Sequence, residues 1–492
     1  MKRLLFINFI LMSSISAQMF SEFSNEPIGN VVLYYISSAP ISDATVTPLC
    51  AYVDSSGEVK DLLFYGIIIY DLNLHAYPCE PTHNTCDKYI ADLFGKGHQL
   101  DSLDIIVHRI KQKLNIADFR WKVILSAPYY KGLSQYNITY YCKKMISIWK
   151  KKHFSNLELL GFYFGYLEWI DEEIIPVIQK MAEYLHSNGY KLFWIPSYQN
   201  SPDLSWFDYG FDYVVEQPNY AFYLPDTLRF LQVDFHIKKY GISGAEMELH
   251  NYASASNGLT LVENANDYFN FAEKLKWQGN PLNVFYFGPL ISDFSRIDTL
   301  RIIYERIYHF VRGYECIILK PVEDAYVELM KPAAKMGATD RLALGTNSYN
   351  NCFRTYLKFD LSRIKTEDSV HWVKLYLKPE KWQCGSSIDD IQLFTISSEV
   401  WTEPNITWNN QPYSAIDSIL DIPFTNLQGL GWRYWDITQA TIKEYHKDKK
   451  FSLMLKRHNE NNEDKICIFH SREKNSLKAP KLYVGVRRKI SY

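Results

Sequence analysis

An alternation of apolar stretches and helical patterns between residues 30 and 313 constrains the fold more than any other feature. Each apolar stretch is nearly continuous, which is typical of parallel strands that are covered on both faces. The segments between them have helical spacing, as in Ile174 to Leu185, which ends at the helix stop Asn188-Gly189. Eight strand–helix units in roughly 290 residues predict a (β/α)8 TIM barrel. The expected strands are Val31–Ser37, Leu62–Leu72, Trp121–Tyr129, Leu159–Glu168, Lys191–Tyr198, Asp212–Asn219, Gly244–Leu249 and Leu282–Pro289.

The expected barrel helices follow most of these strands. Two connections, 38–61 and 73–100, look irregular and fit the barrel pattern least well. Besides the helix that ends near Leu185, the helical segments are Leu103–Leu114, Ile138–Trp149, Leu228–Tyr240, Tyr268–Trp277 and Leu300–Val311.

After Gly313 the apolar spacing changes to a period of two. Arg354–Ser362, Trp372–Leu377 and Phe451–Leu455 alternate between apolar and polar residues, with turn-rich joins and one helix expected at 438–446. This pattern predicts an all-β sandwich with jelly-roll character. The predicted organisation is therefore a leader at 1–17, a barrel at 25–313 and a sandwich at 316–488.

The first residues have the features of a secretory signal peptide. Lys2 and Arg3 precede the apolar run Leu4–Met12, and small residues follow as far as Ala17. We therefore expect a secreted protein, extracellular or periplasmic, with no membrane-spanning segment. With 53 Lys+Arg against 55 Asp+Glu and no long run of one sign, nucleic acid and anionic membranes are not expected partners.

The eight cysteines are interpreted in the light of that export. Cys79 and Cys86 bracket a short loop that a disulfide could close, and an oxidising compartment favours this bridge. With His75 and His83 the same stretch also offers a zinc-ligand set, which remains the alternative. The other six are scattered singly and are interpreted as small buried hydrophobes or as pairs that spacing cannot predict.

Two glutamates mark the expected catalytic centre, because barrel sites lie at the carboxyl ends of the strands. Glu168 ends the fourth expected strand and Glu248 the seventh, across the barrel. A period of two places Glu246 beside Glu248 on the inner face, with Met247 on the outer face. Glycoside hydrolysis needs two such carboxyl groups. The alternative is that these glutamates are salt-bridged stabilisers or solvated rim residues.

Other polar and aromatic side chains are expected at the same end of the barrel. They could bind sugar hydroxyls or stack on sugar rings, or they could instead pack and satisfy the loop backbone. The sequence has no glycine-rich phosphate loop, no zinc-protease motif and no nucleophile elbow, so neither a cofactor nor a metal is expected. The candidate substrate-binding residues are Tyr198, Glu216, Gln217, Asn219, Tyr220 and Tyr286.

Four motifs of the barrel region resemble domain-of-unknown-function family 4855, whose members are exported bacterial barrels similar to glycoside hydrolases. The resemblance implies a sugar-active barrel. Better-known glycosidase barrels have Asn directly before the acid/base glutamate, whereas Leu167 precedes Glu168 here. The motifs are Gly161–Phe164 leading to Glu168, Phe193–Tyr198, Glu216–Tyr220 and Glu246–Glu248.

Five further motifs, between about 318 and 486, resemble the DNRLRE domain, which overlaps carbohydrate-binding module family 96. The resemblance implies a sugar-binding sandwich. Trp382, Trp401, Trp408 and Trp432 could form a stacking platform there or belong to the core. The motifs are Asp324–Val327, Arg354–Ser362, Trp401–Glu403 with Thr407–Asn409, Trp435–Thr438 and Phe469–Glu473.

Together these patterns predict a secreted glycoside hydrolase-like protein that acts on a polysaccharide or oligosaccharide, with no protein partner indicated. Glu168 is the expected general acid/base and Glu248 the nucleophile or base. The alternative is a non-catalytic glycan-binding or cell-surface protein with an inactive barrel.

Overall fold

The computed structural model divides the chain into two compact units, Met1–Ser295 and Arg296–Tyr492. The predicted leader at 1–17 lies outside the described residues. The structure describes residues 27–36, 41–71, 85–127, 135–165, 170, 172–199, 205–222, 226–249, 261–287, 298–366, 368–382, 391–396, 400–413, 416–420, 433–460, 463–474 and 478–487.

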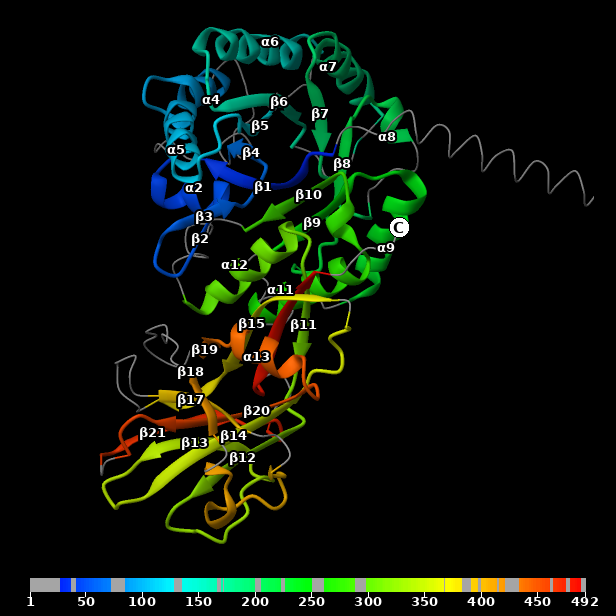
Figure 1. Cartoon of the computed structure of the whole chain (residues 1–492). Helices are drawn as coiled ribbons and strands as arrows, with labels where there is room; N and C mark the ends of the chain where they lie inside the picture. Colours follow the sequence, from blue (N-terminus) through cyan, green and yellow to red (C-terminus); the bar gives the residue numbers. More distant parts are fainter. Residues whose placement is uncertain are drawn as a thin grey trace, which may run out of the picture. The chain divides into compact units, whose positions relative to one another are not determined.

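Eight parallel strands of the first unit close into a barrel in the order β1-β10-β9-β8-β7-β6-β5-β4 (Figure 1). Each strand overlaps one of the predicted stretches, so the predicted TIM-barrel class is confirmed. Several strands end before their predicted last residue, and β6 differs most, since it ends at Tyr163 and not at Glu168. The strands are β1 (Gly29–Ile36), β4 (Gly66–Asp71), β5 (Trp121–Ser126), β6 (Leu157–Tyr163), β7 (Lys191–Trp194), β8 (Tyr213–Glu216), β9 (Gly244–Glu248) and β10 (Leu282–Tyr286).

Helices connect these strands, and four of those in the first unit lie close to their predicted positions: α5 (Gln99–Leu114), α6 (Gln135–Lys152), α7 (Ile175–Ser187) and α9 (Leu228–Tyr240). The helix expected at Tyr268–Trp277 is α11 (Leu261–Lys274), which begins and ends earlier than predicted. The polar residues of its first half weaken the apolar period, so the sequence pattern did not reveal its start. The two irregular connections contain short elements that periodicity does not detect. They are α2 (Asp43–Cys50), the hairpin β2 (Ala51–Val53) and β3 (Val59–Leu62), and α4 (Thr85–Phe94).

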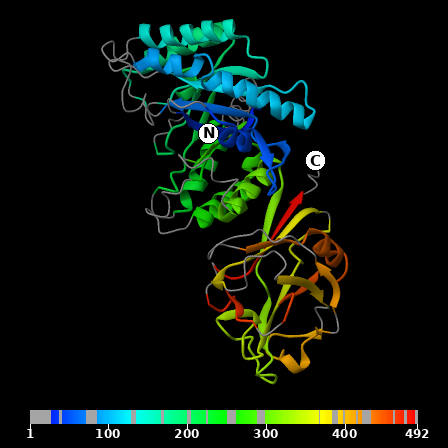
Figure 2. The same cartoon turned by 90° about the vertical axis from the view of Figure 1, so that its left-hand side faces the viewer.

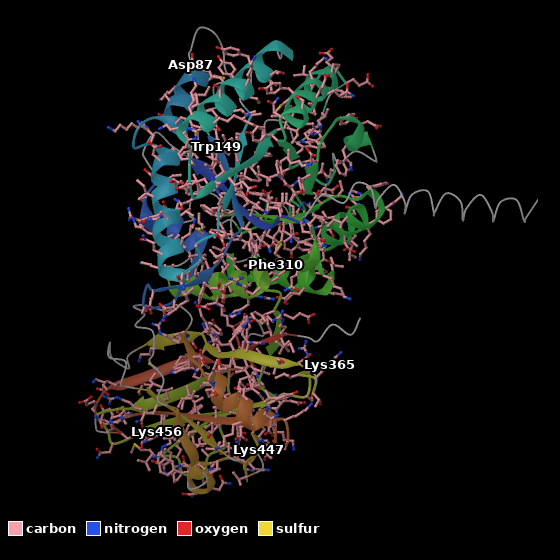
Figure 3. The ribbon with its side chains drawn as sticks, turned by 45° about the horizontal axis from the view of Figure 1, so that its top comes forward. Asp87, Trp149, Phe310, Lys365, Lys447 and Lys456 are labelled. Atoms are coloured by element: carbon pink, nitrogen blue, oxygen red, sulfur yellow. The ribbon has the colours of Figure 1, made fainter. Side chains whose placement is uncertain are left out.

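Contacts between side chains attach the outer helices to their neighbours (Figure 3). Lys144 of α6 forms an ion pair with Asp87 of α4. The ring of Trp149, near the end of α6, lies 4.8 Å from that of Phe154. In the part of the chain that the structure describes, no helix combines the length and the apolar character needed to cross a membrane.

The second unit is built mainly of antiparallel strands (Figure 2). Alternate residues of its two main sheets, such as Val373 of one and Leu453 of the other, share one hydrophobic core, which confirms the predicted all-β sandwich. The smaller sheet has the order β11 (Glu315–Leu319), β22 (Lys481–Arg487), β15 (Ser369–Leu377), β19 (Arg433–Asp436). The larger has the order β16 (Pro379–Trp382), β21 (Lys465–His470), β13 (Arg341–Thr346), β14 (Cys352–Asp360), β20 (Lys450–Arg457), β17 (Ile391–Ile396), β18 (Ile416–Leu420), and β12 (Glu323–Glu328) pairs with β14.

Two α-helices belong to the described part of the second unit. α12 (Asp298–Val311) stacks its His309 ring on Trp372 of β15 at 4.2 Å. Glu305 of the same helix forms an ion pair with Lys374 of β15 at 3.3 Å. The other helix is α13 (Thr438–Tyr445), close to its predicted position at 438–446.

The cysteines fall into two groups. Cys86 and Cys467 are disulfide-bonded, and their partners lie outside the described residues. A disulfide removes the Cys86 thiolate that zinc would need, so the zinc alternative is not supported. Cys79, His75 and His83 lie outside the described residues, so the pairing with Cys79 stays a prediction. The free cysteines among the described residues are buried: Cys50, Cys142, Cys316 and Cys352.

Candidate active site

The inner face of β9 carries two glutamates at the carboxyl end of the barrel. In the parallel register, Glu246 lies beside Val284 and Glu248 beside Tyr286 of β10. Val284 belongs to the cluster that fills the barrel, and Tyr286 packs against that cluster. Because neighbouring residues in register share a face, both glutamates point inward, and both are at most 1% exposed.

The approach of the two strands depends on Gly244, at the start of β9. A Cβ atom at this position would lie 1.7 Å from the carbonyl oxygen of Leu282 on β10. Only glycine therefore allows β9 to lie against β10 in this register.

A group of tyrosines in mutual contact lies near Glu246. Burial raises the pKa of Tyr35 above its ordinary value, and Tyr286, Tyr163 and Glu246 raise it further. The rings are in contact, with centroids 5.6 Å apart for Tyr35 and Tyr286, 5.5 Å for Tyr35 and Tyr70, and 5.9 Å for Tyr70 and Tyr163. These residues come from the carboxyl ends of β1, β4, β6 and β10, so the group lies at the mouth of the barrel.

Glu248 accepts a hydrogen bond from the hydroxyl of Tyr268 on α11. Tyr268 is fully buried, and burial, followed by the charges of Glu248 and Glu246, raises its pKa well above the ordinary value. It therefore donates at every physiological pH. A donor held against a carboxylate favours the ionised form of that carboxylate.

Two predicted binding residues lie elsewhere. Glu216 is in register with Ala245 on the outward-facing side of β8, and its carboxylate contacts Nδ1 of His236 on α9 at 2.9 Å. Tyr220 is 2% exposed and donates to Oδ2 of Asp267 at 2.8 Å. The expectation that these two side chains face a sugar is corrected, because both are buried among the helices.

The loops that follow β7 and β8 contain three further candidates. Asn219 has a left-handed backbone with φ of 55°, and its Nδ2 donates to Oγ of Ser197 at 2.8 Å, so it satisfies the loop. Tyr198 is half-buried, with the Arg229 guanidinium 5.7 Å from its ring centre. Gln217 follows the inward-facing Val215 by two residues, so it lies on the same face, towards the mouth of the barrel, and it is partly exposed.

The described mouth thus joins Glu246, Glu248 and Tyr286, all of which the sequence predicted. Glu168 lies outside the described residues. Four tyrosines of the site were not among the residues predicted from the sequence: Tyr35, Tyr70, Tyr163 and Tyr268. Alternation from Val31 and Ile68 would have placed Tyr35 and Tyr70 on the inner face, whereas nothing local distinguishes Tyr268. Two carboxylates with several hydroxyl donors can accept, hold and return protons.

In the second unit, the two tryptophans of the predicted platform whose side chains the structure describes lie in different environments. Trp401 is buried against Tyr356 and belongs to a core cluster. Trp408 is half-buried, with the Arg354 guanidinium 4.4 Å from its ring centre and 4.1 Å from that of Tyr413, which is 41% exposed. The side chains of Trp382 and Trp432 lie outside the described residues.

Each of the two units matches the model of a known family. Residues 37–139 and 134–309 match the model of a family described as domain of unknown function (DUF4855). The chain belongs to the DUF4855 family. Residues 316–485 match carbohydrate-binding module family 96. The predicted order, a DUF4855 barrel followed by a family 96 module, is confirmed, and so is the coarser prediction of carbohydrate binding.

Solved structures similar to the DUF4855 chain are distant in sequence. Two are mutant tryptophan synthase alpha-subunits from the hyperthermophile Pyrococcus furiosus. One has a TM-score of 0.30 and 10% identity, the other 0.31 and 11%, and each match covers 57% of this chain and 97% of that chain. A structure of the tryptophan synthase a2b2 complex from the same organism has a TM-score of 0.29 and 12% identity, over 58% and 97%. No curated protein matches the chain.

Proposed function

We propose that this DUF4855 barrel is a secreted glycoside hydrolase that acts on a polysaccharide held by its family 96 module. One observation carries the proposal: Glu246 and Glu248 are buried side by side on the inner face of β9, among hydroxyl donors, at the carboxyl end of the barrel. Burying two carboxylates is unfavourable for folding, so their retention at this end is better explained by catalysis than by stability.

In the proposed mechanism, Glu248 is the nucleophile or the base. The Tyr268 hydroxyl donates to its carboxylate and favours the ionised form, which attacks the anomeric carbon or takes a proton from water. Glu168 is the proposed general acid, which protonates the leaving oxygen as the glycosidic bond breaks. Glu246, whose charge acts on Tyr35, is the second candidate for this proton transfer.

Two features support secretion. The pattern from Lys2 to Ala17 is that of a signal peptide. The disulfide bonds of Cys86 and Cys467 are characteristic of an oxidising compartment.

A carbohydrate-binding module in the same chain supports a polymeric substrate. A tethered module raises the local concentration of a multivalent polysaccharide at the barrel without any new contact at the active site.

The decisive experiment measures reducing-sugar release from a polysaccharide panel by the wild type and by Glu248→Gln, Glu168→Gln and Glu246→Gln. We expect Glu248→Gln to lower kcat by about a thousandfold, since the nucleophile or base is lost. Glu216→Gln is the matched control, because it changes a buried strand glutamate that faces the helices.

Three results would count against the proposal. If the wild type binds a polymer but releases no sugar from any, the chain is a non-catalytic glycan-binding protein. Full activity in Glu248→Gln and Glu246→Gln would place the chemistry elsewhere. An equal loss in Glu216→Gln would indicate damage to the fold.

A further inference from the structure

Three carboxylates converge at one edge of the sandwich in the second unit. Asp324 lies on β12, Glu403 in the segment after β17, and Glu473 directly after β21 (strands labelled in Figure 1). One oxygen from each lies within 4.8 Å of the oxygens of the other two. Such spacing allows a single ion to contact all three.

Asp324 supplies a separate indication of a ligand. Its side chain is completely buried, and its Oδ1 atom has no hydrogen-bond partner among the described residues. This carboxylate faces the carboxylates of Glu473 and Glu403. A buried acceptor facing like charges needs a compensating cation.

The backbone holds the three segments in this arrangement. The Asp324 N–H donates to Oε2 of Glu403 at 3.1 Å, and the Arg472 N–H donates to Oδ2 of Asp324 at 3.0 Å. Gly337 packs directly on Glu403, since a Cβ atom there would lie 2.5 Å from the Glu403 carbonyl oxygen. The cluster is therefore part of the folded scaffold and not a chance meeting of flexible chains.

The charges near the cluster leave room for a divalent ion. The Arg472 guanidinium contacts Glu403 at 2.7 Å and Glu473 at 2.8 Å. The adjacent Glu323 forms an ion pair with Lys358, which neutralises it. Three carboxylates and one guanidinium leave a net charge of −2.

We propose that Asp324, Glu403 and Glu473 form a binding site for a hard divalent cation, calcium, in the sandwich. All three ligands are carboxylate oxygens, which calcium prefers and which offer no soft donor for zinc. Exposure increases from Asp324 to the 12% of Glu403 and the 28% of Glu473, which provides an entry route from solvent. The ion joins β12 to the loop ends after β17 and β21, so its role is to stabilise the module.

The test uses the full chain after EDTA treatment and dialysis, with CaCl2 as the probe, in calorimetric unfolding and in isothermal titration. We expect one bound calcium per chain. The unfolding temperature of the second unit should rise by about 5 °C at a hundredfold excess over Kd. MgCl2 at equal ionic strength should have a smaller effect, because magnesium keeps its waters.

Variants locate the ion. Asp324→Asn should abolish both the heat of binding and the rise in unfolding temperature. Glu473→Gln, on the exposed side, provides the same test if Asp324→Asn fails to fold. Glu328→Gln is the matched control, because Glu328 is a buried carboxylate on the same strand that contacts Asn351, and it should keep the full calcium response.

Two results would overturn the site. One is the absence of both binding heat and stabilisation of the wild type at 10 mM CaCl2, about tenfold above the Kd of the weakest extracellular calcium sites. The other is an unchanged response in both Asp324→Asn and Glu473→Gln. The proposal is independent of glycoside hydrolysis, since no sugar enters the assay.

Discussion

Removing the hydroxyl of Tyr268 is the most direct probe of the barrel site. Tyr268→Phe keeps the ring, which packs on Phe230 at 4.9 Å, and deletes only the donor to Glu248. A hydrogen bond to a charged group contributes about 1.5–3 kcal/mol, and the buried carboxylate then lacks that donor. We expect the free energy of unfolding at pH 7 to fall by about 2–3 kcal/mol.

The loss should depend on pH. The deleted donor stabilises the ionised carboxylate, so the cost of Tyr268→Phe should shrink as the pH falls and Glu248 takes up a proton, because a protonated carboxyl group forms only a neutral hydrogen bond. In an active barrel the acid limb of the pH–activity profile should move to higher pH by about one unit, because the charged form of Glu248 has lost support.

The assay is urea unfolding followed by tryptophan fluorescence, with the transitions of the two units fitted separately. Tyr220→Phe is the matched control, because it deletes a hydroxyl that donates to Asp267. The ring of Tyr220 lies beside that of Tyr268, with their centroids 5.9 Å apart. Tyr220→Phe should lower the free energy of unfolding by about 1 kcal/mol and leave the pH–activity profile unchanged. A Tyr268→Phe protein as stable as the wild type at pH 7 would refute the assigned bond.

Three further predictions concern packing and charge. Gly244→Ala should destabilise the barrel by about 3 kcal/mol or more, because its Cβ would lie 1.7 Å from the Leu282 carbonyl oxygen, whereas Gly279→Ala, with nothing within 4 Å, should stay within about 0.5 kcal/mol in urea unfolding. Burial lowers the pKa of His309 to about 3, so from pH 6.5 downward the unfolded state gains a proton that the folded state lacks. The free energy of unfolding should therefore fall by up to about 1.4 kcal/mol per pH unit. His309→Gln should flatten this slope, and equal slopes in the variant and the wild type would contradict the prediction. Arg354→Lys should cost about 1–3 kcal/mol, because it breaks a bidentate pair with Glu460 at 2.8 and 2.7 Å and the stack on Trp408, while the exposed Arg341→Lys should be neutral in thermal unfolding.

Much of the barrel could be predicted because local pattern and global fold agree there. Strands covered on both faces must be apolar throughout, and that property alone located all eight. The short elements α2, β2, β3 and α4 were missed, because strands of three or four residues and helices of eight or ten carry too little periodicity.

The direction of each strand-end side chain was predictable only where the sequence interrupts the apolar run. Met247 between two glutamates indicates which face of β9 is dry, so Glu246 and Glu248 could be assigned inward. In β8, Tyr213 to Glu216 offers no such contrast, and Glu216 proved to face His236.

The sequence alone thus specified two architectures and one pair of inward carboxylates, because those depend on periods of two and 3.6 residues that any local window contains. The tertiary structure supplied the partners. Tyr268 meets Glu248 from a helix that follows the strand, at a separation of 20 residues. Asp324 meets Glu403 across 79 residues. Such meetings depend on how strands close and loops pack, and no local pattern records them.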